Sequence, residues 1–140
     1  MAGSELSEKQ AEYLVTVVTE STEARKRLDE IDRLLTDPAE ISADIIRDLV
    51  LEIVGHGNFL RKSLRKLEAA VRTTEATRYI ELKLEKEEAG DKFTDGALKT
   101  EASKYIGPIR KTRNLFQGYV ESADASLSVC RMVLSSEDRS

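Results

Sequence analysis

The sequence predicts an all-α protein: an elongated helical bundle built around a long antiparallel helical hairpin. Of its 140 residues, 40% are hydrophobic and 34% are charged, with only 7 Gly and 2 Pro, a profile typical of long, solvent-exposed helices. Aromatic residues make up 5% of the chain, which predicts thin helical layers without a thick aromatic core. Apolar residues recur at three- and four-residue steps, the period of an amphipathic helix, and we find no convincing strand or internal repeat.

A first helix is predicted over residues 5–36. Either Ser4 or Ser7 is placed to cap it, and Gln10 follows Ser7 by three residues in the stretch "SEKQ", as in a capping box. The apolar stripe of this helix is interrupted near Ser21, so one of its faces is apolar but not continuously.

A second helix, over residues 42–56, carries the strongest apolar stripe and is predicted to be the most deeply buried. Pro38 ends the preceding helix, because the residue before a proline is biased away from helical angles. Ser42 is placed to cap the second helix. The stretch "GHGN" at residues 55–58 predicts a kink or short break, because each interior Gly costs about 1 kcal/mol relative to Ala.

The hairpin is predicted from residues 58–90 and 95–135. Its first helix reaches about 45 Å at the usual rise per residue, which is longer than a small globule is wide. Gly90 is placed as the C-terminal cap of this helix, and Thr94 or Asp95 as the N-cap of the next.

Pro108 is predicted to kink or restart the returning helix, because it supplies no N–H and crowds the preceding turn. Residues 136–140 are predicted to form a frayed tail. All of these elements belong to one helical domain, residues 1–140, in keeping with the length of the chain. We expect a homo-oligomer, because a long hairpin with apolar residues on both helices cannot bury them all alone.

The composition also limits the location of the protein. The N-terminus lacks a basic region followed by an apolar core, and no run of about 18 apolar residues occurs, so we expect neither secretion nor membrane spanning. A single cysteine excludes an internal disulfide. We therefore expect a cytoplasmic protein, in the host cytoplasm if a phage encodes it.

No motif indicates an enzyme. His56 is the only histidine, which rules out a catalytic triad or a two-histidine metal site within one chain. Cys130 on the last helix is predicted to be a small core residue rather than a nucleophile. The acidic residues near the turn lack the ligand spacing of an EF-hand and are predicted to be a solvated helix end. We expect no cofactor and no metal.

Basic residues give the strongest functional signal, although the formal net charge of −4 argues against coating nucleic acid by bulk charge. One group precedes the turn and a second lies on the returning helix, so an antiparallel hairpin would join them in one positive surface. Tyr79 is placed to stack on an unpaired base. The alternative is that these charges only balance acids on exposed helices. The candidate nucleic-acid-binding residues are Arg61, Lys62, Arg65, Lys66, Arg72, Arg78, Tyr79, Lys83, Lys99 and Lys104.

The stretches "LRKLEAAVRTTEATRYIELK" and "GDKFTDGALKTEASKY", followed by a long final helix, resemble the layout of UvsY-type recombination mediators and related short helical phage proteins. The similarity covers about residues 60–135. The resemblance implies a homo-oligomeric accessory factor that binds single-stranded DNA and helps a RecA-like recombinase displace single-strand-binding protein. It places the DNA contacts at Arg72, Arg78, Tyr79 and Lys83, with Lys99 and Lys104 behind them. The N-terminal helix has no obvious counterpart in that layout.

Two classes of function therefore remain. The first is a non-enzymatic, single-stranded-DNA-binding accessory protein of recombination or replication. The second is a helical protein–protein interaction component, such as a phage structural or assembly protein or an inhibitor, in which the charges only keep long helices in solution.

Overall fold

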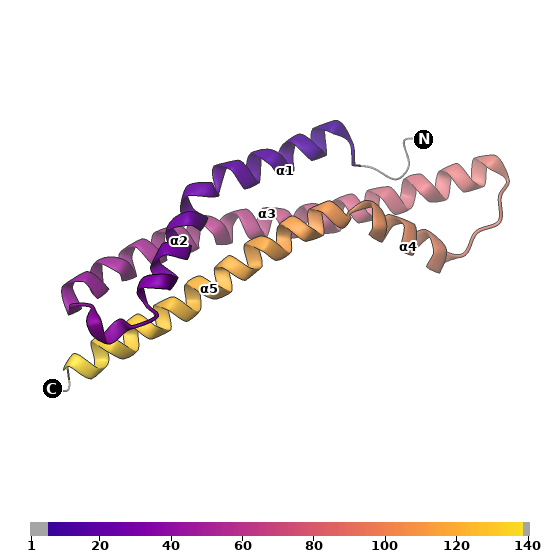
Figure 1. Cartoon of the computed structure of the whole chain (residues 1–140). Helices are drawn as coiled ribbons and strands as arrows, with labels where there is room; N and C mark the ends of the chain where they lie inside the picture. The colour runs from indigo at the N-terminus through magenta and orange to yellow at the C-terminus, as the bar shows by residue number, and fades with distance from the viewer. Residues whose placement is uncertain (1–5, 139–140) are drawn as a thin grey trace.

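A computed structural model, which describes residues 6–138, confirms the all-α class and the long antiparallel pair (Figure 1). The helices are α1 (Glu8–Glu20), α2 (Thr22–Leu34), α3 (Ala43–Ala89), α4 (Asp95–Tyr105) and α5 (Gly107–Asp138), with a short 3-10 turn η1 (Pro38–Glu40) before α3. Among these helices none carries the long apolar stretch that crossing a lipid bilayer requires.

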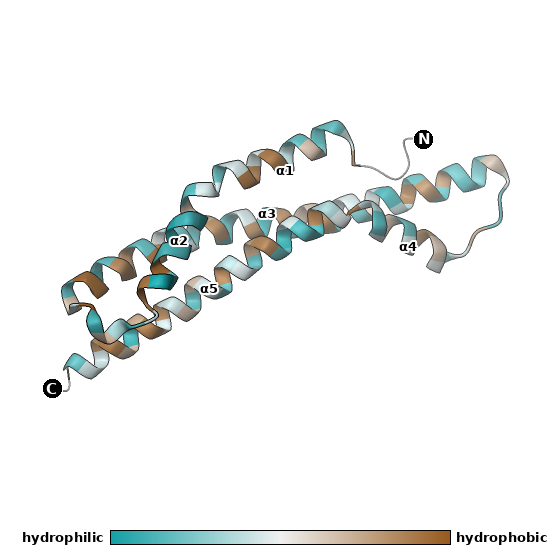
Figure 2. Cartoon of the chain, in the orientation of Figure 1, coloured by the Kyte–Doolittle hydropathy of each residue, from teal (hydrophilic) through white to brown (hydrophobic). Residues whose placement is uncertain are grey.

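The hairpin of α3 and α5 forms the body of the molecule. α3 has 47 residues and is therefore about 70 Å long, and α5 runs back along its first two thirds (Figure 1). Figure 2 shows apolar residues on both helices, interspersed with hydrophilic ones along their length. The core residues that these two helices contribute are Ile46, Leu49, Ile53, Leu60, Leu64, Leu67, Val71, Ile109, Phe116, Val120, Ala123 and Cys130.

A kink or short break was predicted at residues 55–58, and the break is wrong, because α3 passes through them as one helix. Ile53 and Leu60, on either side, are buried in the core, and this burial offsets the weak helix propensity of the two glycines. Gly57 faces α5, where a Cβ would lie 3.5 Å from the Cβ of Ala123. Gly55 lies on the opposite, open side of the helix, where a Cβ would meet nothing within 4 Å.

The predicted single helix over residues 5–36 is also wrong, because it divides at Ser21 into α1 and α2. The capping box at Ser7 is confirmed: Ser7 Oγ accepts from the Gln10 N–H at 3.2 Å. Ser21 is buried and its hydroxyl donates to the Val18 carbonyl at 2.8 Å, while Arg25 Nε donates to Ser21 Oγ at 2.9 Å. Such local side-chain bonds compete with a regular helix. Residue 5 lies outside the described part of the chain.

Most of the predicted caps are confirmed. Ser42 accepts a hydrogen bond from the N–H of the third residue of α3, Ile45, and Gly90 closes α3 in the left-handed region at φ 71°. Thr94 caps α4 through the Ala97 N–H at 3.1 Å.

The returning segment restarts as predicted, with α4 ending at Tyr105 and α5 beginning at Gly107, one residue before Pro108. The tail at 136–140 is only partly described: α5 stays helical through Asp138, so residues 136–138 are not frayed. The last two residues lie outside the described part.

Two polar contacts fasten α2 to the hairpin. The Nε and Nη2 atoms of Arg27 donate to the two carboxylate oxygens of Glu52 on α3, each at 2.8 Å. Its Nη1 atom lies 3.1 Å from the carboxylate of Glu30. This pair holds the pKa of Glu52 below its usual value. Tyr119 on α5 donates its hydroxyl to Asp29 at 2.9 Å. α2 therefore bridges both long helices.

Candidate nucleic-acid interface

Five of the ten predicted residues lie along one edge of α3. Their spacing of four, seven, seven and four residues keeps them on one side of the helix. We call this side the basic edge; it consists of Arg61, Arg65, Arg72, Tyr79 and Lys83. Contacts of Arg61 with α5 and of Tyr79 with α4 place the basic edge beside the returning segment.

The two ends of the basic edge differ in how much charge is neutralised. Arg61 forms an ion pair with Asp124 of α5, so its charge is neutralised within the molecule. Arg65, Arg72 and Lys83 are exposed, and none of them forms a salt bridge with a carboxylate whose side chain the structure describes. The cations of the edge that form no salt bridge therefore lie from Arg65 onward, toward the turn.

A groove of about 580 Å³ opens between this part of α3 and α4. Arg72 and Lys99 stand on its walls, and its apolar lining comes from two alanines and the exposed side chain of Ile80. The full lining is Arg72, Glu75, Ala76, Tyr79, Ile80, Lys99 and Ala102. Side chains from both helices thus form one concave, partly apolar surface flanked by cations.

Tyr79 is held in place at the groove by Asp95. The Tyr79 hydroxyl donates to the Asp95 carboxylate, and this bond raises the pKa of Tyr79 and lowers the pKa of Asp95. Lys99 lies 3.6 Å from the same carboxylate. The tyrosine ring is therefore oriented before any ligand arrives, but the charge of Lys99 is partly neutralised.

Glu75 brings a negative charge to the groove, and Arg110 of α5 compensates it at 3.1 Å. Arg110 also donates to the hydroxyl of Ser103 at 2.6 Å, which ties α5 to α4 at the floor of this region. Ile80, Glu75 and Arg110 were not among the predicted site residues. Their contribution depends on how α4 folds back, and no local sequence pattern reports that.

Arg78 was predicted to contact nucleic acid, but it is only 7% exposed. Its guanidinium lies 4.9 Å from the centre of the Tyr105 ring and donates to Glu81 at 3.1 Å. Arg78 therefore supports the packing of α3 on the returning segment instead of contacting a ligand. The sequence held a signal for this position: Arg78 follows Val71 by seven residues and precedes Leu82 by four, and both are core positions.

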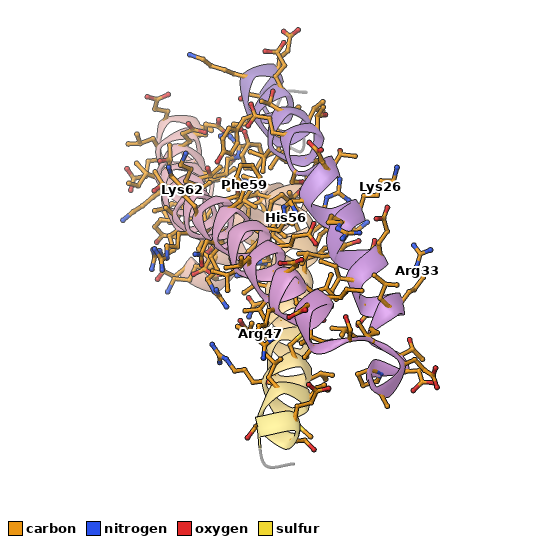
Figure 3. All side chains as sticks on the ribbon, turned by 90° about the vertical axis from the view of Figure 1, so that its left-hand side faces the viewer. Lys26, Arg33, Arg47, His56, Phe59 and Lys62 are labelled. Atoms are coloured by element: carbon orange, nitrogen blue, oxygen red, sulfur yellow. The ribbon has the colours of Figure 1, made fainter. Side chains whose placement is uncertain are left out.

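The remaining three predicted residues are exposed but lie away from the groove. Lys62 and Lys66 each follow a basic-edge residue by one position, a rotation of about 100° around the helix. Figure 3 shows Lys62 on the side of α3 away from Lys26 and Arg33 of α2. Lys104 follows Lys99 by five residues, a rotation of about 140°, and so lies on the far side of α4. The predicted single positive surface is therefore divided among several faces.

Cys130 and His56, the two residues considered for chemistry, lie apart from the groove. Cys130 is fully buried, and burial raises the pKa of its thiol. His56 lies in an open polar hollow with Glu52 and Arg27 and is part of the continuous helix α3. Within residues 6–138, no three acidic, histidine or cysteine side chains are grouped so as to hold a metal ion.

No protein-family model, curated protein or solved structure matches this chain. The resemblance to recombination mediators thus depends on the pattern of residues 60–135 alone. The physical argument for function comes from the basic edge and its groove.

Proposed function

We propose that this chain is a non-enzymatic accessory protein that binds single-stranded DNA along the basic edge. The observation that carries the proposal is the juxtaposition of three unpaired cations with a preoriented aromatic ring in a partly apolar groove. Arg65, Arg72 and Lys83 contact backbone phosphates, and Lys99 adds a fourth contact from α4. A base enters the groove and stacks against Tyr79, a contact worth about 1–3 kcal/mol.

The shape of the groove favours a single strand over a duplex. Bases in a duplex are stacked and paired, so a protein reaches their faces only after unstacking them at a cost of a few kcal/mol. A single strand presents its bases without that cost. Arg72 and Lys83 are eleven residues apart, which is about 16 Å along the helix, so a strand lying along α3 contacts both.

A role in loading a RecA-like recombinase against single-strand-binding protein rests on the resemblance to UvsY-type mediators. Binding by one edge with about four cations is weak, because each phosphate contact contributes little at physiological salt. A mediator of this kind works through several linked edges, whose combined avidity exceeds the affinity of one.

A second candidate is a helical protein–protein interaction component without nucleic-acid binding. It is favoured by large apolar side chains that remain on the surface of the described chain. Leu51 is 72% exposed, Met132 71% and Val15 66%. Such side chains mark a protein contact where they adjoin one another in a patch.

A salt titration with a fluorescently labelled single-stranded oligonucleotide tests the first proposal. Three to four phosphate contacts predict a slope of log K against log salt of about −2 to −3. Arg72→Glu and Lys83→Glu should each weaken binding and reduce the slope by about 1. Lys104→Glu, a charge reversal on the far side of α4, is the matched control and should preserve most of the affinity. Absence of binding at low salt would leave the second candidate.

A further inference from the structure

The outer face of α3, opposite the core, carries a regular exposed stripe over the first half of the helix. Its residues follow one another at steps of four, three, four, four, three and four, which keeps them on one face. We call this face the outer stripe; it consists of Asp44, Asp48, Leu51, Gly55, Phe59, Lys62 and Lys66. All seven are exposed, and the side chain of Phe59 is 44% exposed.

The outer stripe is symmetric about Gly55 in position and complementary in charge. Leu51 and Phe59 lie four residues before and after Gly55. Asp48 and Lys62 lie seven residues before and after it, and Asp44 and Lys66 lie eleven residues before and after it. Each acid on one side of Gly55 thus has a base at the same distance on the other side.

We propose that α3 pairs with α3 of a second copy of this chain, antiparallel, about a two-fold axis at Gly55. In this arrangement Asp48 meets Lys62 of the other copy, Leu51 packs on Phe59, and the two glycines face each other. An isologous interface requires such self-complementarity. If one residue contacts a second residue of the other copy, the two-fold axis repeats the same contact with the copies exchanged. A parallel arrangement would instead place like charges opposite each other, which is unfavourable.

Gly55 gives the proposed axis a physical basis. A glycine in the middle of an exposed helix face weakens the helix relative to alanine, and a Cβ at Gly55 would meet nothing within 4 Å in its own chain. Gly57, by contrast, faces the core, where a Cβ would lie 3.5 Å from the Cβ of Ala123. Facing glycines bring two helices to the short end of the usual 8–10 Å axial separation, which lets the flanking apolar side chains interdigitate.

The charges of the outer stripe are free for such contacts. Lys62, Lys66 and Asp48 form no ion pair in residues 6–138, whereas Asp44 has only an exposed pair with Arg47. The stripe spans 22 helical steps, about 33 Å. A single helix pair of this length lies at the low end of specific interface sizes, so we expect a dimer that dissociates on dilution.

This pairing does not depend on DNA binding, because it uses a different face of α3 from the basic edge. It reassigns Lys62 and Lys66 from nucleic-acid contacts to contacts between copies. The two basic edges of a dimer run in opposite directions on one particle.

Sedimentation equilibrium of the full chain over a wide concentration range tests the proposal. The 15.7 kDa chain should show a reversible monomer–dimer equilibrium. Gly55→Gln should raise the dimer dissociation constant at least tenfold without harming the helix, because Gln is a better helix former. Gly118→Gln is the matched control, since Gly118 is also exposed with open space around its Cβ position, and it should leave the constant unchanged.

Charge exchange gives a second, independent readout. Asp48→Lys should weaken the dimer about tenfold by opposing Lys62 of the other copy, and the double variant Asp48→Lys with Lys62→Asp should restore it. Under a mild oxidant Gly55→Cys should crosslink to itself, whereas Gly118→Cys should not, because a disulfide needs Cα atoms within about 7 Å. A monomer at all concentrations, or a dimer insensitive to Gly55→Gln and to the charge exchange, overturns the proposal.

Discussion

Truncating Leu98 to alanine should release α4 from α3 while leaving the long hairpin intact. The main core and the contact of α4 with α3 form two separate buried clusters. The smaller one contains only Leu82, Leu98 and Ala102, with Tyr79 and Phe93 partly buried against it. Leu98 is 1% exposed and is the larger of the two buried side chains of α4. Apart from the hydrogen bond between Tyr79 and Asp95, little else holds the first turns of α4 in place.

The expected magnitude follows from the size of this cluster. A buried Leu→Ala change costs about 2–5 kcal/mol, depending on how far the site collapses. This cluster borders solvent and can relax, so we expect about 2–3 kcal/mol. Since each 1.4 kcal/mol is a factor of ten, the undocked state of α4 should become about 25- to 150-fold more populated.

Hydrogen exchange measured along the chain is the appropriate assay, because it reports local opening separately for each helix. In Leu98→Ala the amides of α4 should exchange faster by the factor given above, whereas those of α5 around Phe116 should keep their protection. Leu60→Ala, a truncation in the main core, is the control and should accelerate exchange in α3 and α5 together. Equal acceleration of α4 and α5 in Leu98→Ala would show that the two clusters open as one unit and would refute this reasoning.

Three further predictions concern contacts between helices. The lowered pKa of Glu52, caused chiefly by its bond to Arg27, means that this pair stabilises the fold above the ordinary glutamate pKa and is lost as pH falls through the lowered value. The melting temperature should therefore fall more steeply below pH 4.5 in the wild type than in Glu52→Gln; equal slopes would contradict this. Gly57→Ala should stabilise the chain by about 0.5–1 kcal/mol in thermal unfolding, because the new Cβ fits against Ala123. Gly57→Leu should destabilise it by about 1–3 kcal/mol through overpacking, and the opposite order would show that α5 does not approach here. Tyr105→Phe should keep the ring beneath Arg78 but lose its hydrogen bond to α1, at a cost of about 0.5–1.5 kcal/mol; unchanged exchange of the α1 amides would argue against that bond.

Local signals in the sequence predicted the helix ends well. Ser7, Ser42 and Thr94 cap helices as expected, and Gly90 ends α3 in the conformation that glycine favours. Each of these features depends on residues within a few positions, so the sequence contains the whole interaction.

The path of the chain through the middle of a helix was predicted poorly. The sequence around Gly55 and Gly57 has weak helix propensity, yet α5 packs against this segment and keeps it helical. The sequence around Ser21 predicts a helix, yet the buried hydroxyl and Arg25 redirect the backbone. Packing against α5 decided the first outcome, and side-chain bonds that the periodicity of the sequence does not reveal decided the second.

The candidate site shows the same division. The basic run on α3 was visible in the sequence, and so was the position of Tyr79 within it. Which cations form no salt bridge could not be predicted. The carboxylate that pairs with Arg61 and the guanidinium that pairs with Glu75 both come from the opposite arm of the hairpin. The groove itself exists only because α4 folds back onto α3.

The helix α3 can contact DNA and a second copy of the chain at the same time, because residues at different rotations around the helix lie on different faces. Arg65 and Lys66 are neighbours in the chain, yet about 100° of rotation puts one on the basic edge and the other on the outer stripe. This separation makes the two proposals distinguishable in one pair of variants. Arg65→Glu should weaken single-stranded DNA binding and leave the dimer constant unchanged, whereas Lys66→Glu should do the reverse. If both variants impair the same property, then α3 presents a single functional face, and one of the two assignments is wrong.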